Sequence, residues 1–74
     1  MIKLDSVFGK ILKSKRQSIN LSQEQLGLKS RLSRSYISDL EMGKKDPSLF
    51  TIFKLASALQ LKPSVLIDEV EDTI

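Results

Sequence analysis

The chain has 74 residues, of which 41% are hydrophobic, and it carries a net charge of +3 at pH 7. This length suits a single small domain, so we treat residues 1–74 as one unit. Cysteine and histidine are absent. Their absence excludes disulfide bridges and removes the usual general base, the thiol nucleophile and most zinc ligand sets. We therefore expect no enzyme, no metal and no cofactor.

The charge is unevenly distributed along the chain. Residues 1–46 contain ten Lys or Arg against five Asp or Glu, whereas residues 47–74 contain two against four. A basic front favours a polyanionic partner or, equally, a solubilising surface. Lysines among the first 20 residues argue against a secretory signal, and no apolar run is long enough to span a membrane. We expect a soluble cytoplasmic protein without a membrane partner.

The first predicted helix follows apolar residues that recur at helical spacing: Phe8, Ile11, Leu12 and Ile19. Asp5 or Ser6 is expected to cap its start. Asn20 is expected to end it, because asparagine tolerates a positive φ better than most residues.

The second predicted helix begins at Gln23. Ser22, followed three residues later by Gln25, forms a capping-box pattern. Leu26 faces inward, and Ser30-Arg31 ends the helix. The third helix is expected to start after Ser33, a good N-cap, and to end at Gly43 in a left-handed conformation.

The fourth predicted helix follows the turn at residues 46–48. It has a broad apolar face: Leu49, Ile52, Phe53, Leu55, Ala56 and Leu59. Pro63 suits the first turn of a fifth helix, at about residues 63–71. Five short helices with tight links predict an all-α domain.

The second and third helices are separated by about three residues, which is the spacing of a helix-turn-helix. On the third helix, Ile37 and Leu40 point inward, with Leu32 before them. The outward residues are polar: Arg34, Ser35, Ser38 and Asp39. The N-terminal residues of a recognition helix are those that meet base edges in the major groove. The pattern therefore favours DNA binding.

These motifs resemble the phage-repressor (XRE-type) helix-turn-helix family over residues 8–67. The resemblance rests on Phe8-Gly9, Arg16, Leu21-Ser22-Gln23-Glu24-Gln25-Leu26, Ser33-Arg34-Ser35-Tyr36-Ile37-Ser38, Glu41-x-Gly43, Pro47-Ser48 and Leu55-Ala56-x-Ala58-Leu59. It implies a compact five-helix, lambda-repressor-like DNA-binding domain. Within the family the chain is most similar to restriction–modification controller proteins. These are homodimers that bind palindromic operators and both activate and repress.

The resemblance implies three partners: double-stranded DNA with an inverted-repeat operator, a second copy of the chain, and RNA polymerase. Two positions depart from the family pattern. Gly27 stands where alanine is usual, and Arg31 stands where glycine or asparagine is frequent. If Arg31 is left-handed, it is mildly strained.

Arg34 is the leading candidate for base readout, because a guanidinium can bond guanine O6 and N7 together. Ser35 is a second candidate, with backbone capping as its alternative. Tyr36 is a third, and packing on Leu32 or the turn is weighted evenly with it. A solvated arginine is the alternative for Arg34.

The resemblance implies a phosphate contact from Gln23 at the start of the second helix, with helix capping as the alternative, and Ser38 is a minor candidate. Lys44 and Lys45 follow Gly43 and are further candidates, with a solvated loop as the alternative. The family places Arg16 and Glu41 as a partly buried ion pair that braces the first helix on the third.

The fifth helix has more apolar residues than one face of a small domain can bury. We expect a homodimer through Val65, Ile67 or Val70, with a purely intramolecular core as the alternative. Two further functions remain open: a phage-type repressor, and an antitoxin-like module that binds a protein and binds DNA secondarily. Neighbouring genes and co-purification would separate them.

Overall fold

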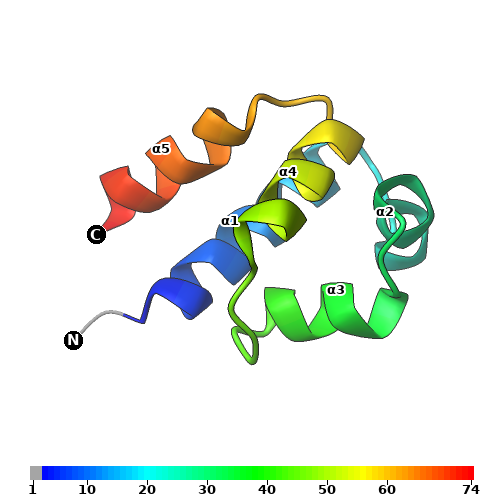
Figure 1. Cartoon of the computed structure of the whole chain (residues 1–74), viewed down its shortest axis with the longest axis horizontal. Helices are drawn as coiled ribbons and strands as arrows, with labels where there is room; N and C mark the ends of the chain where they lie inside the picture. The colour runs from blue at the N-terminus through cyan, green and yellow to red at the C-terminus, as the bar shows by residue number, and fades with distance from the viewer. Residues whose placement is uncertain (1–2) are drawn as a thin grey trace.

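The computed structural model describes residues 3–74 and contains five helices (Figure 1). These are α1 (Leu4–Ser18), α2 (Gln23–Ser30), α3 (Arg34–Glu41), α4 (Leu49–Ala58) and α5 (Pro63–Thr73). Over these 72 residues no strand is formed. The predicted all-α, five-helix fold is confirmed.

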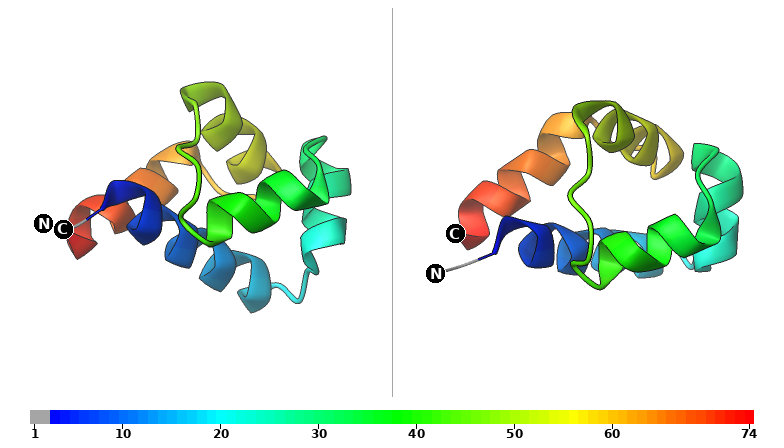
Figure 2. Two further views of the ribbon diagram at one scale, coloured as in Figure 1. Left: turned by 90° about the horizontal axis from the view of Figure 1, so that it is seen from below. Right: turned by 60° about the horizontal axis from the view of Figure 1, so that its bottom comes forward.

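The helices pack in a small set of pairs. α1 lies against α3 and α5, α2 against α3 and α4, and α4 against α5. Figures 1 and 2 show α3 along one side of the molecule, with α2 standing at its N-terminal end and α1 passing its C-terminal end. This arrangement holds α3 at the surface between two other helices.

Every helix contributes to one core. Six large side chains are fully buried, and they come from all five helices: Leu12, Leu26, Ile37, Leu40, Leu55 and Leu66. All five helices therefore share one apolar interior, and α3 cannot shift without disturbing it.

Three serines cap helices in the same way. The hydroxyls of Ser22, Ser33 and Ser48 each accept a hydrogen bond from the backbone N–H three residues further on. At Ser22 the box is complete, because Gln25 also accepts from the Ser22 N–H at 2.8 Å. The predicted starts of α2 and α3 are confirmed.

The predicted cap of α1 is wrong. The N-cap is Lys3, which makes no side-chain cap, and Asp5 lies inside the first turn, where its Oδ1 accepts from the N–H of Ser6 at 2.8 Å. The helix extends further forward because Val7, only 9% exposed, packs in the interior and its N–H bonds to the Lys3 carbonyl. Packing here outweighs the local capping preference.

Four residues that follow helices have positive φ. Asn20 (φ 60°) and Gly43 (φ 72°) end α1 and α3 as expected. Arg31 (φ 61°) ends α2 and is left-handed, so the strain considered for it is present. Gln60 (φ 60°) ends α4 in the same way, although no sequence signal marked it.

The apolar face of α4 is wider than the part that the core buries. Leu55, Ala56 and Leu59 are buried, whereas Leu49 is 70% exposed and Phe53 is 53% exposed. The broad apolar face predicted for this helix therefore extends beyond the core at Leu49 and Phe53. These two residues lie on the side of α4 that faces solvent, because five short helices enclose only one interior.

Within residues 3–74, no single helix is long and apolar enough to cross a membrane. α4 and α5 pass that test only as a pair, and they are bent by 110° at their junction.

Candidate nucleic-acid interface

The turn between α2 and α3 is tightly built. A Cβ atom added at Gly27 would lie 2.8 Å from the carbonyl oxygen of Leu32. The N–H of Leu32 donates to the Gly27 carbonyl at 3.0 Å, and Arg31 between them takes the left-handed conformation. The absence of a side chain at Gly27 thus lets the turn close on α2. The family resemblance implies alanine at this position.

α1 and α3 also approach closely. A Cβ atom at Gly9 would lie 2.7 Å from the carbonyl oxygen of Glu41. Both ends of α3 are therefore fixed by a glycine contact, one from α2 through the turn and one from α1.

The N-terminal end of α3 is polar and exposed. Arg34 and Ser35 are exposed, while Ile37 and Leu40 on the other side of the helix are fully buried. The Ser35 hydroxyl lies 3.4 Å from that of Ser33, the N-cap. The structure therefore brings the two leading base-readout candidates together at one accessible helix end.

Tyr36 lies differently from these two. It is partly buried against the core, and its hydroxyl is 3.3 Å from Thr51 Oγ1 on α4. Thr51 in turn accepts a hydrogen bond from the Ser48 hydroxyl at 3.0 Å. The tyrosine packs toward the start of α4, so the phenol tip sits at the edge between α3 and α4.

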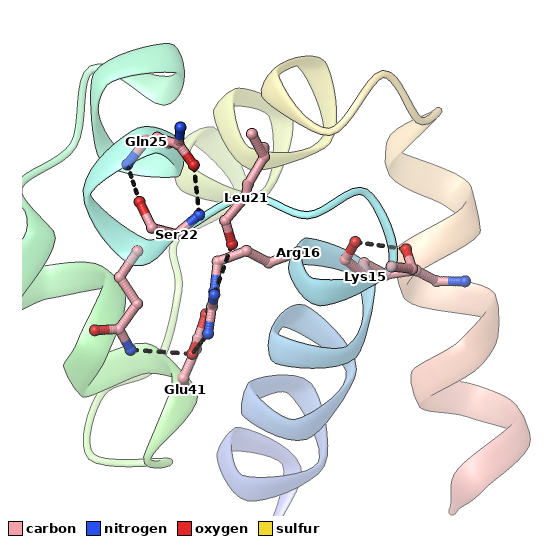
Figure 3. Close-up of polar contacts among 8 residues, drawn as sticks. Lys15, Arg16, Leu21, Ser22, Gln25 and Glu41 are labelled. Atoms are coloured by element: carbon pink, nitrogen blue, oxygen red, sulfur yellow. Dashed lines mark hydrogen bonds and ion pairs between the residues drawn. The ribbon is translucent and has the colours of Figure 1, made fainter.

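An ion pair fixes the other end of α3 (Figure 3). Arg16 Nε lies 2.6 Å from Glu41 Oε2, and Arg16 Nη2 lies 2.9 Å from Oε1. The third donor, Nη1, bonds to the Leu21 carbonyl at 2.7 Å. One guanidinium therefore joins α1, the loop before α2 and the last residue of α3.

Burial makes this pair sensitive to the loss of either partner. The two side chains are only 9% and 3% exposed. The hydrogen bonds from Arg16 to Glu41 raise the pKa of Arg16, and they outweigh desolvation, which acts in the opposite direction. A cation whose pKa is raised on folding stabilises the fold at all pH values below its unfolded pKa, so this contribution is lost only in strong alkali.

Gln23 takes part in the same network. Its Nε2 donates to Glu41 Oε1 at 3.1 Å, across from α2 to α3. The sequence predicted Gln23 as a phosphate ligand, with capping as the alternative, and missed this third role. No sequence signal marks this contact, because Gln23 and Glu41 lie 18 residues apart and Glu41 Oε1 already accepts from Arg16.

The remaining phosphate candidates lie around α3. Lys44 and Lys45 are exposed in the loop after the helix, where the Lys44 N–H bonds to the Asp39 carbonyl at 2.9 Å. Ser38 is partly buried. Gln23, Lys44 and Lys45 thus lie near the C-terminal end of α3, whereas Arg34 and Ser35 lie at its N-terminal end.

The three dimer candidates on α5 differ in exposure. Val65 and Val70 are partly buried, and Val70 packs against the core, whereas Ile67 is 45% exposed. A second ion pair, Lys15 with Glu69 at 2.5 Å, fastens α5 to α1. In the part of the chain that the structure describes, no three His, Cys, Asp or Glu side chains are grouped so that they could hold a metal ion.

The chain is similar in sequence to a known protein family and to two named proteins. A family model described as helix-turn-helix matches residues 12–66. The immunity repressor protein of Bacillus phage phi105 is 39% identical over 61 residues, which cover 82% of this chain and 42% of that protein. The control protein C.BamHI of Bacillus amyloliquefaciens is 45% identical over 49 residues, which cover 66% of this chain and 60% of that protein.

A crystal structure is also similar. The restriction–modification controller protein C.AhdI from Aeromonas hydrophila superposes with a TM-score of 0.82 at 42% sequence identity. The superposition covers 84% of this chain and 94% of C.AhdI. The chain therefore spans about half the length of the two curated relatives named above, but nearly all of this controller protein.

Proposed function

Since this chain belongs to the helix-turn-helix family, we propose that it is a sequence-specific DNA-binding transcription regulator of the restriction–modification controller type. It binds an inverted-repeat operator as a homodimer. The observation that carries the proposal is the exposed N-terminal end of α3, with Arg34 and Ser35 accessible on a helix whose other face is fully buried.

The fixed position of α3 supports this function. Base readout needs side chains held within a fraction of an ångström of the base edges. α3 is held by the Gly27 contact at its start and by the Arg16–Glu41–Gln23 network at its end. Arg34 is then presented on a rigid element, and a bidentate bond to guanine O6 and N7 is the expected contact.

The surrounding polar groups supply sequence-independent affinity. Lys44 and Lys45 would neutralise phosphates on one side of α3, with Ser38 nearby. Gln23 lies at the N-terminus of α2, where backbone N–H groups favour an anion. Its amide has a second N–H beyond the one given to Glu41, so it can hold a phosphate while remaining in the network. Ser35 and Tyr36 complete the proposed contact surface.

The controller assignment rests on the pattern of similarity. Identity to the control protein C.BamHI is 45%, and the chain covers 94% of the controller C.AhdI. A phage-type repressor is the second candidate, favoured by 39% identity to the phi105 immunity repressor. The proposal includes a cytoplasmic location, where operator DNA lies, and contact with RNA polymerase during activation. The relatives are named as regulators and control proteins, and no catalytic role is proposed.

Selection from a pool of random DNA duplexes tests the function directly. We expect recovered sequences to share an inverted repeat with half-site centres about 10 bp apart, since two recognition helices enter successive major grooves on one face of the duplex. Titration should then give specific binding at least about 10³ tighter than that to unrelated DNA at the same salt concentration. Equal affinity for all duplexes would contradict the proposal.

A further inference from the structure

Large apolar side chains on the outward face of α4 are mostly exposed. Leu49 and Phe50 are each 70% exposed, and Phe53 is 53% exposed. Phe53 follows Leu49 by four residues and Phe50 by three, so the three side chains share one face of the helix. Together they expose roughly 350 Å² of apolar surface, about half of what one partner contributes to a standard protein interface.

A groove lies beside this face. It has a volume of about 220 Å³ and lies between the start of α1, the loop before α4, and α5. Its apolar lining is formed by Leu4, Phe8, Pro47, Ile52, Ile67 and Val70. A cavity of roughly 150 Å³ is enough to admit a benzene ring. The groove can therefore accept a phenylalanine side chain.

The charges on the two surfaces are opposite. Asp5 and Asp46 line the groove. On the α4 face, the Lys54 ammonium lies 4.6 Å from the centre of the Phe50 ring. Beyond Phe53 the surface becomes more basic, since Lys29 and Arg31 line a hollow there together with Lys54. One surface is thus apolar with a basic edge, and the other is apolar with an acidic edge.

We propose that the homodimer forms by reciprocal insertion. Phe50 of each copy enters the groove of the other, and Lys54 of each copy pairs with Asp46 of the other. In a two-fold interface, when residue i contacts residue j of the partner, j must also contact i. The two surfaces can meet this condition because Pro47 in the loop before α4 lines the groove and Phe50 projects from the first turn of the helix, three residues later. The two-fold axis passes near Leu49.

This inference rests on the proposed function, because it assigns the interface of the proposed homodimer. It also revises the expectation from the sequence. Ile67 and Val70 take part as groove lining, whereas the projecting group comes from α4. Val65 does not line the groove.

Charge reversal gives the decisive test. In Lys54→Asp alone, both reciprocal pairs become Asp against Asp, and in Asp46→Lys alone both become Lys against Lys. Each variant should dimerise at least about tenfold more weakly than wild type in analytical ultracentrifugation, because like charges across an interface repel. An equimolar mixture of the two variants restores both attractive pairs and should dimerise like wild type.

Phe50→Ala tests the apolar contact, with Leu28→Ala as its matched control. Leu28 is also a large exposed side chain, at 76%, but it lies on α2. Phe50→Ala should weaken dimerisation at least about tenfold, with an unchanged melting temperature at concentrations where wild type is also monomeric, and Leu28→Ala should leave dimerisation unaltered.

The inference would be overturned if either charge variant dimerised as tightly as wild type, or if the mixture remained monomeric. Wild type that stays monomeric well above its DNA-binding concentration would also overturn it. All these variants keep Arg34, so titration of a single half-site with monomer tests DNA recognition separately. Loss of half-site binding in wild type counts against the proposed function, whereas intact half-site binding with a failed mixture counts only against this interface.

Discussion

Gln23, the first residue of α2, donates a hydrogen bond to Glu41, the last residue of α3. The same carboxylate accepts two hydrogen bonds from Arg16 on α1. The start of one helix of the helix-turn-helix is thereby tied to the end of the other through a single side chain. Gln23, which we propose for phosphate binding, thus belongs to the same network as the Arg16–Glu41 brace.

This connection predicts a double effect for Gln23→Ala. Loss of a hydrogen bond to a charged group should lower the free energy of unfolding by ~1–2 kcal/mol, and loss of a proposed phosphate contact should reduce the salt dependence of operator binding. Urea unfolding and binding titrations at several salt concentrations measure the two effects. Gln17→Ala, at an exposed position on α1, is the control and should stay within ~0.5 kcal/mol of wild type. An unchanged salt slope in Gln23→Ala would remove the phosphate assignment.

The Arg16–Glu41 pair should show strong coupling. Arg16→Met leaves Glu41 buried without its main partner, and we expect a loss of ~3–5 kcal/mol. The double variant Arg16→Met with Glu41→Leu should recover much of this loss, because no uncompensated charge remains. Thermal or urea unfolding of both single variants and the double variant completes the cycle. Additive losses would show that the two residues do not couple.

Replacing Arg34 and replacing Lys44 should affect DNA binding in different ways. Arg34→Ala should weaken operator binding by ~1–3 kcal/mol and relax discrimination at one base pair in each half-site. Lys44→Ala should weaken binding to all sequences alike and lower the salt slope by ~1. Titration against a set of single-base operator variants separates them. If Arg34→Ala preserves the ranking of those operators, the arginine does not read a base.

The left-handed conformation of Arg31 should cost stability. A non-glycine residue in this region is disfavoured by roughly 1–2 kcal/mol, and glycine removes most of that cost while losing more entropy on folding. Arg31→Gly should therefore stabilise the fold by up to ~1 kcal/mol, which raises the melting temperature by about 4–8 °C in a domain of this size. Lys29→Gly, inside α2, should instead destabilise by ~1 kcal/mol. A lower melting temperature for Arg31→Gly would show that the arginine side chain stabilises the turn.

The sequence by itself determined the local features of this protein. Capping at Ser22 and Ser33 and the left-handed ends at Asn20 and Gly43 depend on interactions within a few residues, so residue type and spacing are sufficient to predict them. Helical periodicity likewise gave the five helices and the outward position of Arg34. These features were enough to place a recognition helix in the chain.

Only the tertiary structure decided how much apolar surface the core could bury. Leu49 and Leu55 have the same hydrophobicity on the same helix, yet one is 70% exposed and the other fully buried. Periodicity shows that α4 is apolar, but the number of neighbouring helices sets how wide a stripe they cover. The partner of Gln23 was decided in the same way, because Gln23 and Glu41 are 18 residues apart and meet only after α2 and α3 have packed.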